Sequence, residues 1–319
     1  MIGDNGEAQI EHARFWYHQG ERPCIKERIV QMDMNTTVLV DTLRFPECPR
    51  WYEGTLWCSD FFARRVIQVD LHGQVQTVAQ LEDMPGGLGW TPQGRLLVVA
   101  AFARRLLRLE DDGLAEVADL SSLVNAPNND LVVDGQGRAY IGNMGYVFGR
   151  GTPQPGPIVL VTAEGSARVV AEGLAFPNGM VITPDGQTLI VAESHAARLT
   201  AFHIEPDGSL SHRRAWAQFE DFGNYGATPG QITPDGICLD AEGAVWIASP
   251  NTRDVLRVKE GAQITDRLPL STIPVACMLG GEGRRTLFIA TTESQDPNDH
   301  QARGRIETIQ VAVEGAGLP

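Results

Sequence analysis

One pattern repeats six times along this chain of 319 residues and limits what the chain can fold into. Each copy contains an apolar segment, a turn rich in Gly with Asp, Pro or Gln, a second apolar segment, a polar loop and a third apolar segment. A fourth such segment usually follows, so each repeat is expected to form four strands. The clearest copies begin at Pro46, Pro85, Asn128, Pro177, Pro234 and Pro274.

Four-stranded units of this size cannot bury both faces alone, so the six copies must stack on one another. Radial stacking predicts an all-β fold, a six-bladed β-propeller with four-stranded blades. The sixth copy ends near Val313 without a clear fourth strand, whereas TTVLVDTL at 36–43 precedes the first copy. We expect this N-terminal strand to complete the last blade, because closure removes exposed strand edges. Residues 1–31 are then an N-terminal extension and residues 32–319 a single domain.

The charge of the chain excludes two classes of partner. Its 40 Asp and Glu residues outnumber its 26 Lys and Arg residues, the formal net charge is −14, and the basic residues form no compact stripe. Nucleic acid and anionic membranes are therefore not expected as partners. The amino terminus is polar and acidic and the chain lacks a continuous apolar run of membrane-spanning length, so neither a signal peptide nor a membrane span is predicted.

The cysteines indicate a reducing compartment. The chain has five of them, an odd number, and none is arranged as CxxC. Neither a disulfide framework nor a zinc cluster is therefore favoured, and the protein is predicted to be cytoplasmic. No pattern in the sequence indicates the oligomeric state.

Six residues occupy the same position in the six copies, at the start of the innermost strand. They are Glu47, Gly86, Asn129, Asn178, Asp235 and Val275. The innermost strands of a propeller surround its central channel and run in one direction, so equivalent residues form a ring at one height. Four of these positions carry side-chain oxygens, a set that suits one hard divalent cation whose charge the two carboxylates neutralise.

This alignment predicts that Glu47, Asn129, Asn178 and Asp235 bind one metal ion. A set of oxygen ligands without His or Cys favours Ca²⁺, with Mg²⁺ or Mn²⁺ as alternatives, and suits Zn²⁺ or Fe²⁺ less well. Two of the four residues have a structural explanation, because Asn178 and Asp235 each precede Gly, and such pairs are common in turns. Glu47 has no such explanation.

At these residues the chain resembles the family of gluconolactonase, regucalcin (senescence marker protein) and luciferin-regenerating enzyme, which are six-bladed propellers. The resemblance covers about Asp41–Val313 and rests on the motifs FPECPRW, NND followed by GRAYIGN, FPNGMVITPDG and TPDGICLDAEGAVWIA. It implies that Glu47, Asn178 and Asp235 bind the metal, and that Asn129 lies near the metal and contacts substrate as in family lactonases. In the similarly built diisopropylfluorophosphatase-type propellers, the residue equivalent to Asn129 ligates calcium.

Two positions depart from the family pattern. The residue after the Glu is usually Gly in the family and is Cys48 here. Cys48 either narrows the space beside the metal or faces away from it, and we favour the second interpretation. Sugar-lactone members carry an Arg two residues before the Asn of the third copy, where it contacts sugar hydroxyls, and this chain has Pro127 there. A sugar lactone is therefore less strongly implied as the substrate.

The loops between the second and third strands should surround the ring, because the second strand returns to the end where the innermost strand begins. These loops, and the long loop at 219–233 with Phe222 and Tyr225, carry aromatic side chains. We therefore expect a substrate less polar than a sugar lactone, bound by stacking and burial. Besides Asn129, the expected substrate-binding residues are Phe61, Phe62, Phe102, Asn143, Tyr146, Phe148 and His195. The alternatives are that the rings pack loops together and that His195 is a bystander, since no Ser or Cys nucleophile signature accompanies it.

Together these patterns predict a metal-dependent lactonase that acts on a small lactone or ester. The metal would polarise the carbonyl, a metal-bound water would attack it, and Asp235 would take the proton of that water. Two alternatives keep the same ring: hydrolysis of another ester or a phosphotriester, and a non-catalytic propeller that binds a ligand. An open coordination position would distinguish an enzyme from a closed structural site.

Overall fold

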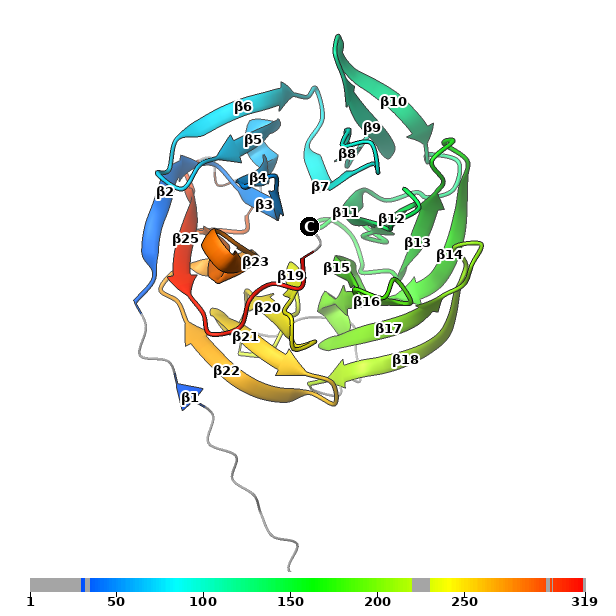
Figure 1. Cartoon of the computed structure of the whole chain (residues 1–319). Helices are drawn as coiled ribbons and strands as arrows, with labels where there is room; N and C mark the ends of the chain where they lie inside the picture. The colour runs from blue at the N-terminus through cyan, green and yellow to red at the C-terminus, as the bar shows by residue number, and fades with distance from the viewer. Residues whose placement is uncertain (1–29, 32–34, 220–229, 297–298, 300, 318–319) are drawn as a thin grey trace, which may run out of the picture.

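A computed structural model describes residues 30–31, 35–219, 230–296, 299 and 301–317. These residues form six sheets around a central channel, each sheet being one blade of a propeller (Figure 1). The predicted all-β fold with six four-stranded blades is confirmed. The helices in the described part of the chain are short 3-10 turns, and none is long and apolar enough to cross a membrane.

The first four blades are each built from four consecutive strands, with the first strand innermost. Blade 1 contains β3 (Pro46–Tyr52), β4 (Thr55–Asp60), β5 (Arg65–Val69) and β6 (Val75–Gln80). Blade 2 contains β7 (Pro85–Trp90), β8 (Leu96–Ala100), β9 (Arg105–Glu110) and β10 (Gly113–Asp119). Blade 3 contains β11 (Asn128–Val133), β12 (Ala139–Asn143), β13 (Gly156–Val161) and β14 (Ala167–Leu174). Blade 4 contains β15 (Pro177–Ile182), β16 (Thr188–Glu193), β17 (Arg198–Ile204) and β18 (Leu210–Gln218).

The last two blades include strands from both ends of the chain. Blade 5 contains β19 (Ile237–Leu239), β20 (Val245–Ser249), β21 (Asp254–Lys259) and β22 (Gln263–Pro269), and β1 (Val30–Gln31) pairs in parallel with its outer edge. Blade 6 contains β23 (Ile273–Gly280), β24 (Thr286–Thr292), β25 (Gly304–Gln310) and β2 (Thr37–Leu43). The 3-10 turns are η1 (Phe61–Ala63), η2 (Ser194–Ala196) and η3 (Glu282–Arg284). Residues 1–29 of the predicted extension lie outside the described residues.

Strand β2 closes the ring, as the sequence predicts. It lies antiparallel to β25, with Thr37 opposite Thr308 and Val40 opposite Ile306. Val40 is buried in the same hydrophobic cluster as Ile306. The two ends of the propeller are therefore joined by backbone hydrogen bonds and by apolar packing within one blade.

The hydrophobic core lies between neighbouring blades. Because alternate side chains of a strand point to opposite faces, one strand serves two interfaces. In β8, Val98 packs toward blade 1, whereas Leu97 and Val99 pack with Leu131 of blade 3. Blade 2 thus packs against both of its neighbours.

The two ends of the channel differ. After β25, residues 311–317 run toward the centre of the ring (Figure 1). The N–H of Ala241 donates to the carbonyl oxygen of Glu314 at 2.8 Å, and the N–H of Ala316 donates to that of Leu239 at 3.0 Å. Leu239 is the last residue of β19. The C-terminal segment therefore covers the end of the channel opposite to the one where the inner strands begin.

Candidate active site

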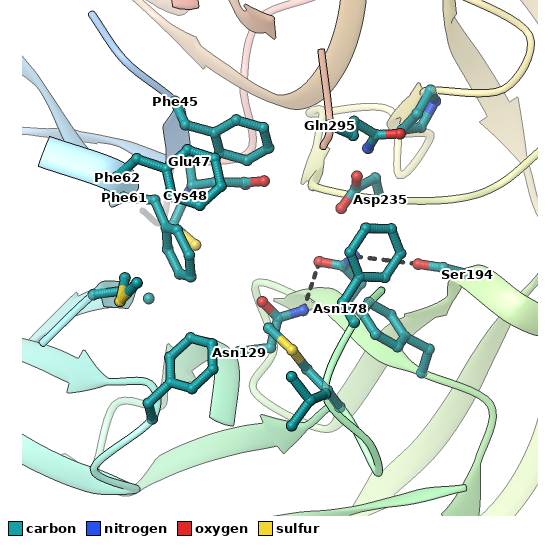
Figure 2. Close-up of a pocket in the computed structure, with 18 of the residues that line it drawn as sticks. Phe45, Glu47, Cys48, Phe61, Phe62, Asn129, Asn178, Ser194, Asp235 and Gln295 are labelled. Atoms are coloured by element: carbon teal, nitrogen blue, oxygen red, sulfur yellow. Dashed lines mark hydrogen bonds between the residues drawn. The ribbon is translucent and has the colours of Figure 1, made fainter. Parts of the chain in front are cut away.

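A cavity of about 890 Å³ lies at the end of the channel where the inner strands begin. Four residues predicted to bind metal line it: Glu47, Asn129, Asn178 and Asp235. We call these four residues the ring. Figure 2 shows their carboxylates and amides extending toward the same space from four blades. Folding thus collects, at one place, oxygen atoms from residues spread over most of the chain.

A backbone irregularity directs the ring side chains into the cavity. The register between the inner and second strands of blade 1 shifts between Glu47 and Arg50. Equivalent shifts occur in blades 2, 3, 4 and 6. Such a β-bulge leaves residues unpaired in the ladder and changes the direction of their side chains. The shift recurs in five of the six blades, so the chemistry of the site depends on which residue each copy places there.

Two repeat positions carry no donor, and one of them has no room for a side chain. A Cβ atom at Gly86 would lie 2.5 Å from the backbone oxygen of Asn129, so this position requires Gly. Val275 is fully buried, and its carbonyl oxygen accepts a hydrogen bond from the N–H of Gly236 at 2.9 Å. The oxygen donors therefore come from blades 1, 3, 4 and 5, while blades 2 and 6 provide close packing.

A chain of hydrogen bonds orients the two amides of the ring. The Nδ2 of Asn129 donates to the Oδ1 of Asn178 at 3.0 Å, and the Nδ2 of Asn178 donates to the Oγ of Ser194 at 3.2 Å. The Oγ of Ser194 in turn donates to the carbonyl oxygen of Pro234 at 2.6 Å. Ser194 thus fixes Asn178 so that its Oδ1 faces the ring. No motif in the sequence indicates this role for Ser194.

The two carboxylates of the ring are hard to keep ionised without a cation. Burial raises the pKa of Glu47 well above its usual range, and the carboxylates of Asp235 and Asp130 raise it further. Burial also raises the pKa of Asp235 to about 8, although a hydrogen bond from Asn178 acts in the opposite direction. Within the described residues, neither ring carboxylate forms an ion pair with an Arg, Lys or His side chain.

The ring fits a hard divalent cation. Two carboxylates would neutralise its charge, and two amide oxygens would complete a set made only of oxygen atoms. In the described residues, no group of three or more His, Cys, Asp or Glu side chains is placed to hold a metal ion. A cation at the ring would therefore depend on the amides of Asn129 and Asn178 as well as on Glu47 and Asp235.

A buried ion pair that the sequence does not indicate joins blades 1 and 3. The Nη2 of Arg50 lies 2.6 Å from the Oδ1 of Asp130, and the side chains are only 6% and 4% exposed. The same Nη2 also donates to the carbonyl oxygen of Leu131 at 2.8 Å. Arg50 and Asp130 each stand close in sequence to a ring residue, but nothing in the sequence indicates that blades 1 and 3 would bring them together.

Cys48 lines the cavity, so the expectation that it faces away from the site is wrong. Its backbone adopts the left-handed conformation, with a φ of 49°. This conformation favours Gly, because a Cβ atom crowds the following carbonyl oxygen. Burial raises the pKa of the Cys48 thiol well above its usual range, so it is a neutral group beside Glu47.

Aromatic side chains form much of the cavity wall. The predicted residues Phe61, Phe62, Phe102 and Phe148 line the cavity, and two residues that the sequence analysis did not select, Phe45 and Phe176, line it as well. The ring centroids of Phe45 and Phe62 are 4.9 Å apart, so this part of the wall packs on itself. In contrast, Phe102 and Phe148 are 42% and 44% exposed and present open apolar surface.

Asn143 and Tyr146 lie behind this wall and are not among the residues that line it. The Nδ2 of Asn143 donates to the carbonyl oxygen of Ala126 at 2.6 Å, and its Oδ1 accepts from the N–H of Gly145 at 3.0 Å. The prediction that Asn143 binds substrate is corrected accordingly, because its amide is buried and holds a loop. Tyr146 instead supports Phe176, with ring centroids 5.8 Å apart.

His195 lines the cavity next to these aromatic residues. Its Nε2 lies 3.3 Å from the hydroxyl oxygen of Tyr146, and its ring centroid is 4.9 Å from that of Phe176. Burial lowers its pKa, which favours the neutral imidazole. His195 is therefore part of the wall and can offer a polar contact there. Phe222 and Tyr225, also expected at the rim, lie outside the described residues.

The fold agrees with comparisons to known proteins. The family model described as the SMP-30/gluconolactonase/LRE-like region matches residues 45–293, which include all four ring residues. The chain belongs to this family. The match also spans blades 1 to 5 and the first two strands of blade 6.

Individual relatives cover nearly the whole chain. It is 27% identical over 283 residues to a 6-deoxy-6-sulfogluconolactonase of Pseudomonas putida, covering 86% of this chain and 93% of that one. Two solved structures share the fold. A luciferin-regenerating enzyme has a TM-score of 0.74 at 16% identity and 88% and 97% coverage of the two chains. A calcium-binding protein, regucalcin, of Agrobacterium tumefaciens has a TM-score of 0.73 at 20% identity and 88% and 95% coverage.

Proposed function

We propose that this protein is a metal-dependent lactonase whose substrate is less polar than a sugar lactone. The observation that carries this proposal is the pair of ring carboxylates, Glu47 and Asp235, which line a large cavity without an ion-pair partner among the described residues. Buried charges of this kind are unfavourable unless a cation or a proton compensates them. The lactonase named among the relatives supports the reaction class.

The metal we propose is Ca²⁺, held by Glu47, Asn129, Asn178 and Asp235. All four contribute oxygen, the atom that calcium prefers. A related fold is that of regucalcin, which is described as a calcium-binding protein. A divalent cation supplies Lewis-acid polarisation of a carbonyl group and lowers the pKa of a water molecule.

The side chains of the ring would then have different roles in hydrolysis. Asp235 would accept a proton from the attacking water through a carboxylate oxygen. The water oxygen forms a bond to the carbonyl carbon, and the C–O bond of the lactone breaks. The proton then passes to the departing alkoxide, giving a hydroxy acid. Asn129 would orient the carbonyl group, and Ser194 would keep Asn178 in position through the hydrogen bond to its Nδ2.

The cavity wall supports a substrate with an apolar substituent. Phe102 and Phe148 expose flat apolar surface, and burying such surface against a ligand is favourable by roughly 25 cal/mol per Å². Pro127 stands where sugar-lactone members of the family are expected to carry an Arg. An aryl- or alkyl-substituted lactone therefore matches this wall better than a lactone surrounded by hydroxyl groups.

The test is hydrolysis of a panel of lactones by metal-stripped protein, with and without added Ca²⁺, Mg²⁺, Mn²⁺, Zn²⁺ or Fe²⁺. The panel extends from gluconolactone to aryl and alkyl γ- and δ-lactones, and acid release is followed with a pH indicator. We expect turnover only with metal and a higher kcat/KM for the substituted lactones. Turnover that survives complete metal removal would contradict metal dependence. Absence of turnover by protein with demonstrated metal binding would contradict the lactonase proposal.

A further inference from the structure

The loop between β12 and β13, residues 144–155, is longer than the repeat requires. We call it the blade 3 loop. The corresponding loops of blades 1, 2, 4 and 5 are the short segments 61–64, 101–104, 194–197 and 250–253. The blade 3 loop is three times as long, and the residues that it contributes to the cavity wall are Met144, Val147, Phe148 and Arg150. A short turn joins the same two strands in the other blades, so the extra length is not needed for connection.

Backbone contacts give the blade 3 loop a defined shape. At its base, Gly145 has a φ of 78°, and a Cβ atom there would lie 2.2 Å from the carbonyl oxygen of Gln154. At its tip, Val147 and Arg150 form an antiparallel β-bridge, in which the N–H of Arg150 donates to the carbonyl oxygen of Val147 at 2.9 Å. The backbone of Arg150 is therefore held beside the cavity, and its side chain can adjust to a ligand.

The tip of the loop offers two kinds of contact to one cavity. Phe148 is 44% exposed, and its ring centroid lies 6.0 Å from that of Phe176 in blade 4. Arg150 follows two residues later and is also exposed. A flat apolar surface and a guanidinium group thus lie on the same short segment of the wall.

Arg150 differs from a second arginine of the wall, Arg64. The Nη1 of Arg64 donates to the carbonyl oxygen of Glu82 at 3.1 Å, and Arg104, at the same place in the loop of blade 2, donates to that of Asn125 at 3.5 Å. The bond of Arg64 therefore recurs with the repeat and has a structural role. Within residues 35–219, 230–296, 299 and 301–317, Arg150 forms no ion pair, so its guanidinium is available to an anion from solution.

The charge of the cavity wall differs from that of the whole chain. The Arg, Asp and Glu side chains that line the cavity are Arg44, Arg64, Arg150, Glu47, Asp235 and Asp299. Positive and negative groups are thus equal in number there, whereas the chain has a formal net charge of −14. A divalent cation at the ring would make the cavity positive, and a positive cavity attracts an anionic ligand.

We propose that the blade 3 loop selects a lactone whose apolar substituent carries an anionic group. Phe148 buries the substituent and Arg150 binds the anion. A carboxylate suits Arg150, because two N–H groups of a guanidinium can donate to its two oxygens. This inference rests on the proposed lactonase function and adds the charge of the substrate to it. The contact lies away from the reacting bond, so it strengthens substrate binding and transition-state binding equally and acts on KM rather than on kcat.

The test uses two lactones of the same shape and different charge. One is a γ-butyrolactone with a para-carboxyphenyl group on its γ-carbon, and the other carries a para-carbamoylphenyl group there. The metal-loaded wild-type protein should show a KM about tenfold lower for the carboxylate. High salt should reduce this difference, because Arg150 is exposed and its charge is screened. Arg150→Met should raise KM for the carboxylate about tenfold and leave KM for the carboxamide unchanged.

Arg253→Met is the matched control. Arg253 is exposed, ends the corresponding loop of blade 5 and is not among the residues that line the cavity. Its replacement removes the same charge from the protein and should change neither KM. If Arg253→Met and Arg150→Met raise KM for the carboxylate equally, the net charge of the protein explains the effect and the inference is wrong.

The same measurements separate this inference from the proposed function. If the wild-type protein hydrolyses both lactones with equal KM, the anionic substrate class is wrong while the lactonase proposal stands. If it prefers the carboxylate and Arg150→Met keeps that preference, another group binds the anion and the role of Arg150 is wrong. If protein with demonstrated metal binding hydrolyses neither these lactones nor those of the panel, the inference fails together with the lactonase proposal.

Discussion

Two sets of buried carboxylates in this propeller have opposite surroundings. Glu193, at the end of β16, is fully buried, but Arg198 lies 2.9 Å and Arg213 lies 3.2 Å from its oxygens. Asp60, at the end of β4, is equally buried and lies 2.9 Å from Arg65. We call Glu193 and Asp60 the hairpin carboxylates.

The electrostatics of the ring carboxylates differ from those of Glu193. Burial acts to raise the pKa of Glu193, yet hydrogen bonds from Arg198 and Thr200 outweigh it and the pKa is lowered. For Asp235, burial dominates and raises the pKa to about 8. Burial alone therefore does not identify a functional carboxylate. The hairpin carboxylates already have cationic partners within the fold, whereas those of the ring remain available to a cation from solution.

The largest expected effect is on activity when a ring carboxylate is removed. Asp235→Asn should lower metal-dependent kcat about 1,000-fold, because it removes both a charge that holds the cation and the proton acceptor. Lactone hydrolysis at saturating metal measures this effect. Asp185→Asn, the same change in an exposed turn, is the matched control and should retain full activity. Wild-type turnover by Asp235→Asn would show that Asp235 is not a catalytic residue.

The next largest effect is on stability when a hairpin carboxylate is removed. Glu193→Gln should lower the free energy of unfolding by about 2 kcal/mol, because Arg198 and Arg213 lose their partner but remain partly solvated. Glu47→Gln should leave the metal-free protein as stable or more stable, since it removes a carboxylate without an ion-pair partner in the described structure. Urea unfolding in EDTA measures both. Equal destabilisation by the two variants would show that the hairpin and ring carboxylates do not differ in their contribution to stability.

The pH dependence of stability should also differ between the ring carboxylates and the hairpin carboxylates. Between its ordinary pKa of 3.8 and about 8, Asp235 keeps a proton in the folded protein that the unfolded chain has lost. The unfolding temperature of the metal-free protein should therefore fall by at least about 5 °C from pH 5 to pH 8. Excess Ca²⁺ should reduce this slope, because the cation replaces the proton.

Glu193 contributes with the opposite sign, since its pKa is lowered and its stabilising effect is lost only as the pH falls below the ordinary value of 4.5. Calorimetry from about pH 3 to pH 8, with EDTA or Ca²⁺, measures both trends. Asp235→Asn should flatten the slope of the metal-free protein. A metal-free protein that becomes more stable from pH 5 to pH 8 would contradict the raised pKa of Asp235.

A smaller effect is expected at the aromatic wall. Phe102→Ala and Phe148→Ala should each raise KM for an aryl lactone about tenfold, with little change in stability, because both side chains are largely exposed. Phe62→Ala should also lower the unfolding temperature, since Phe62 packs on Phe45. Steady-state kinetics with an aryl lactone and with gluconolactone measure the difference. Identical KM values in all variants would rule out substrate binding by this wall.

The smallest effect concerns the backbone beside the ring. Cys48→Gly should raise the free energy of unfolding by about 1 kcal/mol, because Gly adopts the left-handed conformation without the steric cost of a Cβ atom. Cys48→Ala keeps the Cβ atom and should not show this gain. Urea unfolding of both variants in EDTA separates backbone strain from loss of the thiol.

The alignment of repeats could reveal the ring because the propeller is periodic. Equivalent positions of six copies must occupy equivalent places around the channel, so Glu47, Asn129, Asn178 and Asp235 could be grouped without coordinates. The same logic identified β2 as the strand that closes blade 6. The expectation from the loops between the second and third strands was wrong at Asn143, whose amide holds Ala126 and Gly145 instead.

The amino-acid sequence by itself thus determined the six blades, their closure and the position of the ring, because each follows from a pattern with a fixed period. Only the tertiary structure decided what surrounds the ring. Ser194 reaches Pro234 of the next blade, and Arg50 of blade 1 reaches Asp130 of blade 3, without any period that a sequence can display. Cys48 lines the cavity with a left-handed backbone that the repeat alignment does not predict. Contacts of this kind depend on how neighbouring blades pack, and that packing exists only once the propeller has closed.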